Sequence, residues 1–194
     1  MSVRGEVTIT NCDFTGGTAP TSGGSIFFAG TKLTMTGGSV TGGTSTNSAA
    51  NSQGGNICIN GGTSTISDCA ISGGTAVRGG NIWMNQPLTL NNCTVTGGKA
   101  VKREMTGNLS VNAQGGNIFV PAAALTLNGC TVTDGAAENG FCHDIYHYGS
   151  NPLTLSGNTK IGHMGIGVDK IRIGEAGIQG SVGVREARVF LPAA

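Results

Sequence analysis

Short stretches of alternating apolar and polar residues run along the whole chain, separated by turns of Gly or Asn. The clearest stretch reads Leu-Thr-Leu at 88–90 and continues as Cys-Thr-Val-Thr-Gly-Gly at 93–98. A period of two residues is typical of β-strands, and no segment has the spacing of an amphipathic helix. The pattern therefore predicts an all-β chain made of short strands.

This stretch recurs along the chain, which indicates a repeat protein. Copies lie at 7–17, 33–43, 65–74, 88–98 and 125–135, with a degraded copy at 153–158. A second phrase, Gly-Asn-Ile in its clearest form, alternates with the first. It occupies residues 24–26, 55–57, 80–82, 116–118 and 143–145.

One repeat cannot close a hydrophobic core, whereas stacked repeats bury a continuous apolar column. We therefore predict a right-handed single-stranded parallel β-helix, a pectate-lyase-like solenoid, with about six coils judged from the repeats. Residues 1–194 form one domain, with repeat coils at about 5–175 and a closing coil or cap at about 176–194. Because the repeat starts close to Met1 without a signal peptide, we interpret the chain as a fragment of a longer protein.

The second phrase predicts which side chains face outward. Its isoleucines should point inward, and the last of them is expected at Ile171. The residue after each should then form an outward column: Phe27, Cys58, Trp83, Phe119, Tyr146 and Arg172. Exposed, this column could stack sugar rings or dock a partner chain; the alternative is that neighbouring loops cover it. Its candidate ligand-binding residues are Phe27, Trp83, Phe119 and Tyr146.

Surplus residues enter the repeat at a single corner, at 44–53 and, at greatest length, at 99–114. Insertions at one edge of a solenoid share a face, and such a face often binds a partner. The alternative is that long surface loops are simply tolerated. Lys99, Lys102 and Arg103 in the longest insertion are candidate contacts for an acidic partner.

Two further columns have structural interpretations. One repeat position holds Cys12, Cys69, Cys93 and Cys130, with Gly38 and Asn158 in the other coils. We expect buried free thiols there, because stacked thiols suit neither a disulfide nor a known metal motif. A second position holds Asn56, Asn81 and Asn117, with Ser25 and Asp144 in register. Stacked Asn side chains are expected to hydrogen-bond along the axis.

Charge and titratable groups exclude several functions. A net charge of +1 offers no basic surface for nucleic acid, and no apolar run is long enough to insert this segment into a membrane. His143, Asp144 and His147 form the one tight titratable cluster, which could supply metal ligands or an acid–base pair; a locally irregular coil is the alternative. The remaining acids do not pair as a sugar hydrolase requires. We expect no catalytic residues, no metal and no cofactor.

The phrases Gly-Gly-Asn-Ile and Leu-Thr-Leu-x-x-Cys-x-Val-Thr-Gly-Gly resemble the right-handed β-helix repeats of large bacterial surface proteins. They are similar to adhesin-like proteins of gut Firmicutes and, more loosely, to chlamydial polymorphic membrane proteins. The resemblance implies an extracellular or cell-surface location and carries over no catalytic residue.

We therefore expect a non-catalytic structural or adhesive module that presents a loop edge and an aromatic face to a glycan or protein partner. One alternative is a carbohydrate-active enzyme, a polysaccharide lyase or hydrolase, which needs a groove with clustered acids. The other is a unit that stacks end to end into a filament or homo-oligomer, because uncapped strand edges invite pairing.

Overall fold

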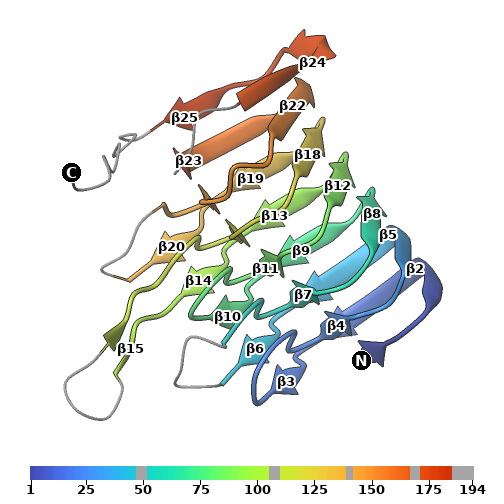
Figure 1. The fold of residues 1–194 in the computed structure, drawn as a ribbon, viewed down its shortest axis with the longest axis vertical. Coiled ribbons are helices and arrows are strands. Elements are labelled where there is room, and N and C mark those ends of the chain that lie inside the picture. Colours follow the sequence, from blue (N-terminus) through green and yellow to red (C-terminus); the bar gives the residue numbers. More distant parts are fainter. Residues whose placement is uncertain (47–51, 105–109, 139–141, 167–170, 185–194) are drawn as a thin grey trace.

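The computed structural model describes residues 1–46, 52–104, 110–138, 142–166 and 171–184. Parallel strands stack in about five turns as a β-solenoid (Figure 1). The all-β parallel solenoid predicted from the repeats is confirmed, with about one turn fewer than expected. Within the described ranges no helix could cross a membrane.

Each turn contributes strands to three faces of the stack. Face one holds β1 (Ser2–Val3), β4 (Ile26–Phe28), β7 (Ile57–Ile59), β11 (Ile82–Met84), β17 (Ile118–Val120), β21 (Ile145–His147) and the end of β23 (Lys160–Ile166). Face two holds the first half of β2 (Glu6–Thr15) and of β5 (Lys32–Thr41), then β8 (Thr63–Ser67), β12 (Leu88–Asn91), β18 (Leu125–Asn128), β22 (Leu153–Gly157) and β24 (Ile171–Ile178). Face three holds the second halves of β2 and β5, then β9 (Ala70–Ser72), β13 (Thr94–Thr96), β19 (Thr131–Thr133), the start of β23 and β25 (Val182–Val184).

One coil illustrates how the core is built. Ile82 on face one, Leu90 on face two and Val95 on face three are all fully buried. Each lies in register with an apolar residue of the coil before and the coil after. Burial of such a side chain contributes about 1.5–3 kcal/mol. The stacked columns therefore supply stability that no single coil has.

The corner between faces two and three explains the Asn, Asp and Gly residues of the turns. The backbone φ is +55° at Asp68, +50° at Asn92 and +62° at Gly129. Only Gly, Asn and Asp adopt this left-handed conformation readily. Asn92 Nδ2 also donates a hydrogen bond to Asp68 Oδ1 at 3.2 Å, which links two corners along the axis.

The predicted Asn column is confirmed from Asn56 onward as a continuous hydrogen-bond ladder, here called the Asn ladder. Ser25 in the same column does not join it, since its Oγ is buried without a hydrogen-bond partner among the described residues. Asn56 Nδ2 donates to Asn81 Oδ1, and Asn81 Nδ2 donates to Asn117 Oδ1, both at 2.8 Å. The second N–H of each amide donates to a backbone carbonyl, and each Oδ1 accepts a glycine N–H. All three side chains are fully buried, so every polar atom in the ladder has its partners.

The cysteine column follows the prediction in its middle and departs from it at both ends. Cys69, Cys93 and Cys130 are buried free thiols. Cys12 is free but exposed, because no described coil precedes it. Thr159 rather than Asn158 follows Cys130, and Cys130 N donates to Thr159 Oγ1 at 3.3 Å. The turn before Thr159 is one residue longer than in the preceding coil, which shifts the register.

The surplus residues leave the stack at one corner, as predicted. After face three the chain enters an arm, a parallel sheet that projects from the stack (Figure 1) and consists of β3 (Thr18–Ala19), β6 (Thr44–Ser45), β10 (Thr75–Ala76), β14 (Lys99–Ala100) and β20 (Ala136–Ala137). The longest insertion adds the antiparallel pair β15 (Arg103–Glu104) and β16 (Ser110–Val111). The chain returns to face one through a column of parallel bridges, here called the return column: Ser22, Gln53, Arg78 and Gln114.

The predicted register of the last coil is wrong. Met164 follows Ile145 on face one, and Gly165 stands where Arg172 was expected. Ile171 pairs instead with Leu153 on face two. The last coil is shorter because β23 runs directly from face three to face one without an arm. Strands β24 and β25 continue the stack into the predicted cap, whose residues 185–194 lie outside the described ranges.

Candidate functional site

The outward column stacks in the predicted register but is not an exposed surface. Its residues pair from coil to coil along face one. Cys58, Trp83, Phe119 and Tyr146 are between 1% and 9% exposed, and Phe27 is half-buried. The expectation of an exposed aromatic face is therefore wrong. These residues form a second apolar cluster outside the main core.

The return column lies beside this cluster and helps to cover it. The Arg78 guanidinium carbon lies 5.7 Å from the centre of the Phe119 ring. The rings of Phe119 and Tyr146 pack at 5.6 Å with a 44° angle between their planes. Burial raises the pKa of the Cys58 thiol to about 12, with a hydrogen bond to Ser22 acting in the opposite direction. The arms therefore give the outward side of face one a packed layer of its own.

Cys142 extends the cluster at its far end. It packs against the outward column, and burial raises the pKa of its thiol to about 11. A Cβ atom on Gly165, the last outward residue, would overlap with Cys142 Sγ. Any side chain at this position would therefore force the Cys142 thiol to move.

The cover is incomplete, and a groove remains between the return column and face one. This aromatic groove, about 420 Å³ in volume, is lined by Gln53, Arg78, Trp83, Gln114, Phe119, Pro121 and Tyr148. Tyr148 is 57% exposed, and its ring lies 6.0 Å from that of Tyr146. Trp83 Nε1 and Arg78 Nε are both buried without a hydrogen-bond partner in the described part of the chain. The groove thus combines aromatic rings with unused donors.

Five residues of this groove were not identified from the sequence, and a signal exists for all of them except Pro121. Gln53, Arg78 and Gln114 all directly precede the Gly-Gly that opens the second phrase. This fixed position marks them as one column. Tyr148 stands two residues after Tyr146, so a strand period of two residues places its side chain on the same outward side.

The basic candidates of the longest insertion do not join the groove. Lys99 is exposed on β14 of the arm. Lys102 N donates to Glu138 Oε2 at 3.2 Å, which ties the arm to the next coil. Arg103 begins the β15–β16 pair. The structure therefore separates these three residues from Phe27, Trp83, Phe119 and Tyr146.

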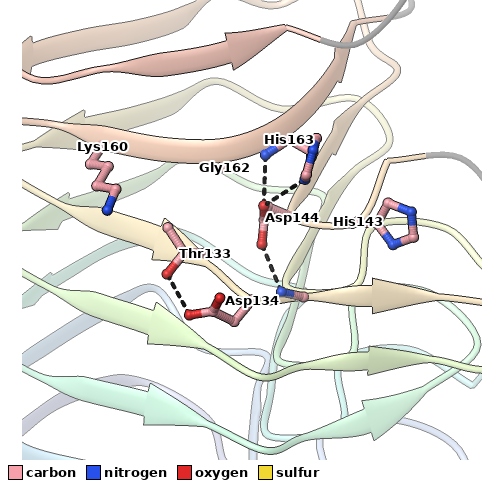
Figure 2. Close-up of a pocket in the computed structure, with 8 residues that line it drawn as sticks. Thr133, Asp134, His143, Asp144, Lys160, Gly162 and His163 are labelled. Atoms are coloured by element: carbon pink, nitrogen blue, oxygen red, sulfur yellow. Dashed lines mark hydrogen bonds and ion pairs between the residues drawn. The ribbon is translucent and has the colours of Figure 1, made fainter.

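The predicted titratable cluster is divided in the same way. His147 points into the core on face one, where burial lowers its pKa. His143 and Asp144 instead line a polar pocket of about 460 Å³ together with His163, which the sequence did not suggest (Figure 2). The two histidine rings are 5.8 Å apart, and Ala137 N donates to His143 Nδ1 at 3.3 Å.

Asp144 ends the Asn ladder, and both of its carboxylate oxygens accept hydrogen bonds. Its Oδ1 accepts from Asn117 Nδ2 and from Gly135 N, both at 2.8 Å. Its Oδ2 accepts from His163 N at 2.7 Å and lies 3.9 Å from His163 Nδ1 (Figure 2). The side chain is 1% exposed. A carboxylate fits here because every neighbour donates and an acceptor-only group ends the ladder.

Metal binding finds no support in these contacts. No set of three or more His, Cys, Asp or Glu side chains among the described residues could hold a metal ion. The polar pocket contains Asp134 as a second acid, but its Oδ2 accepts a hydrogen bond from Thr133 Oγ1 at 2.9 Å. The aromatic groove is therefore the stronger candidate for a binding site.

No protein-family model matches the chain, and no curated protein or solved structure matches it. The shared repeat phrases thus remain a resemblance to adhesin-like surface proteins.

Proposed function

We propose that the chain is a non-catalytic β-solenoid module of an extracellular or cell-surface protein, and that it binds a glycan in the aromatic groove. The lining of the groove carries the proposal, because it places Trp83 and Tyr148 beside the amides of Gln53 and Gln114. Aromatic rings pack against the apolar faces of a sugar, while donors and acceptors bind its hydroxyls.

The dimensions and rigidity of the groove support a small ligand. Its volume of about 420 Å³ lies within the range of about 300–1,000 Å³ that is usual for such sites. Its walls come from several coils that parallel ladders hold in register. A preformed site loses little conformational entropy on binding.

A glycan array with the purified protein tests the proposal, with released sugar assayed in the same wells. Retention of a glycan without product is the expected result. Product formation would favour the carbohydrate-active alternative and direct attention to the polar pocket. Silence on both counts would leave a structural rod or a protein partner and would refute glycan binding.

The variant Tyr148→Ala locates the site. Tyr148 is 57% exposed, so its removal leaves the core intact. An aromatic contact of this kind contributes about 0.5–1.5 kcal/mol, so affinity should fall by roughly two- to tenfold. The control is Thr65→Ala, an exposed residue on face two, which should bind as the parent does. Equal binding by both variants would move the site elsewhere.

End-to-end association stays a separate prediction. Light scattering over a range of protein concentrations measures it. A strict monomer at high concentration would contradict it without affecting the groove.

A further inference from the structure

We infer that the ligand of the aromatic groove is a saccharide that carries a carboxylate, and that Arg78 binds this carboxylate. The inference rests on the proposed function. It adds that the ligand carries a negative charge and that Arg78 recognises this charge. Four features of Arg78 carry it: its burial, its lack of an anion, its place in the return column and its neighbours in the groove.

Arg78 is a partly buried cation without a partner charge. Its Nε is buried and makes no hydrogen bond to a described residue. Its guanidinium carbon lies over the face of the Phe119 ring, 5.7 Å from the ring centre. The ion pairs within the described ranges join Lys32 to Glu6 and His163 to Asp144, and neither involves Arg78. Burial lowers the pKa of the guanidinium, as expected for a cation that is partly removed from water.

The fold does not require arginine at this position. The equivalent rungs of the return column are Ser22, Gln53 and Gln114, all of them neutral. The contacts that hold the column are backbone hydrogen bonds, such as Arg78 N to Ser52 O at 3.0 Å and Gly54 N to Arg78 O at 2.9 Å. A neutral side chain would serve the stack equally well. The guanidinium is therefore available for a ligand.

A carboxylate matches the donors that the groove offers. The planar guanidinium binds a carboxylate through two parallel hydrogen bonds. Trp83, which also lines the groove, has a buried Nε1 without a hydrogen-bond partner among the described residues. Tyr148, whose side chain is exposed, provides the flat apolar surface on which a sugar ring packs. An acidic peptide would satisfy Arg78 but would leave the aromatic rings without a matching ring.

The chain contains an internal probe for this groove. Trp83 is the single tryptophan of the sequence, so fluorescence excited at the tryptophan band reports on the groove itself. Two matched pairs of probes serve for titration: trigalacturonate with its methyl ester, and 3′-sialyllactose with lactose. They separate a uronate from a sialate as the source of the carboxylate. A short polyglutamate peptide tests an acidic polypeptide.

We expect an acidic probe to change Trp83 fluorescence and to bind at least about tenfold more tightly than its neutral partner, because charge-assisted bidentate contacts are strong. Arg78→Gln, which copies the Gln53 and Gln114 rungs, should abolish this preference. Arg78→Lys keeps the charge without the planar fork and should lie between the two. Lys32→Gln removes one positive charge on face two, outside the lining of the groove, and should bind as the parent does.

Each outcome bears on one of the two proposals. Neutral and acidic sugars bound equally would overturn the inference while the glycan-binding function stands. Binding of no sugar would overturn both. A preference for acid that survives in Arg78→Gln, or equal binding of polyglutamate, would refute the assignment to Arg78 and a saccharide. The comparison of trigalacturonate with its methyl ester uses the unmodified protein. It therefore tests the preference for a carboxylate even if a variant misfolds.

Discussion

The Asn ladder and the return column are two polar columns of the same solenoid, and they differ in how their side chains are satisfied. In the ladder, Asn81 uses both N–H groups and its Oδ1 on protein atoms at 2.8–2.9 Å. In the return column, Arg78 Nε has no hydrogen-bond partner among the described residues, and the same holds for Trp83 Nε1 of the groove lining. A buried polar atom with partners stabilises the fold, whereas one without partners weakens it unless something else binds there.

Access distinguishes the two kinds of column as well. The ladder is sealed between coils, and its Asn side chains are fully buried. The return column borders a groove that is open beside Tyr148. We therefore attribute a structural role to the ladder, and the open return column supports the proposed binding site.

The largest expected effect is the loss of a ladder rung. Asn81→Ala leaves two donors unpaired, Gly74 N and one N–H of Asn56 Nδ2. It also removes one of two donors from Thr96 O and from Asn117 Oδ1, which keep Gly73 N and Gly98 N. At about 1–3 kcal/mol for each stranded donor, the free energy of unfolding should fall by roughly 2–6 kcal/mol. Urea denaturation measures it. The matched control is Asn85→Ala, whose exposed bond to Asn60 is worth less than about 1 kcal/mol.

The end of the ladder gives a smaller effect of a more specific kind. Asp144→Asn conserves shape but replaces Oδ2, which accepts from His163 N, with an NH₂ group. Two donors would then face each other in a buried site, at a cost of about 1–3 kcal/mol. Thermal unfolding of the two proteins side by side measures the difference. Unchanged stability would show that the ladder does not need an acceptor at its end.

His147 extends the comparison of the two columns, because it is buried and polar but lines neither the aromatic groove nor the polar pocket. Its position holds Met84 two coils earlier, so His147→Met should pack. Because burial lowers the folded pKa of His147, the unfolded chain binds a proton first as the pH falls below its own value of about 6.5. Wild-type stability therefore drops between neutral pH and pH 5.

We expect His147→Met to be more stable than the parent by about 1 kcal/mol at pH 8, and by more at pH 5. Urea midpoints at the two pH values measure this. Parallel pH profiles for the two proteins would show that His147 does not titrate with unfolding.

The smallest expected effect on stability belongs to the return column. Arg78→Gln removes the contact with Phe119 and should change the free energy of unfolding by less than about 1 kcal/mol. The same urea curves measure it. A loss as large as that of Asn81→Ala would erase the distinction between the two columns.

The repeat phrases predicted most of the fold because alternation and turn chemistry are local. They placed Ile82 and Val95 in the core and aligned Asn56, Asn81 and Asn117 before any contact was known. Alternation also placed Trp83 on the outward side, but it could not show what lies opposite an outward residue. That depends on where each arm returns to the stack.

The candidate site was therefore predicted only in part. Trp83 and Phe119 line the groove as expected. Arg78 and Tyr148 could be assigned to the groove only once the path of the arms back to face one was known. His163 reached Asp144 because the last coil omits an arm. A contact between residues so far apart in the sequence cannot be predicted from the repeat spacing around either of them.

The most direct test of the account is the urea unfolding of Arg78→Gln and of the parent protein, each with and without trigalacturonate. At a hundredfold excess over its dissociation constant, the ligand should stabilise the parent by about 2.7 kcal/mol. We predict that the two proteins differ by less than about 1 kcal/mol without ligand. With ligand, a tenfold loss of affinity should reduce the gain of Arg78→Gln to about 1.4 kcal/mol or less. An equal gain in both proteins, or a ligand-free variant several kcal/mol less stable than the parent, would contradict the assignment of the return column to binding.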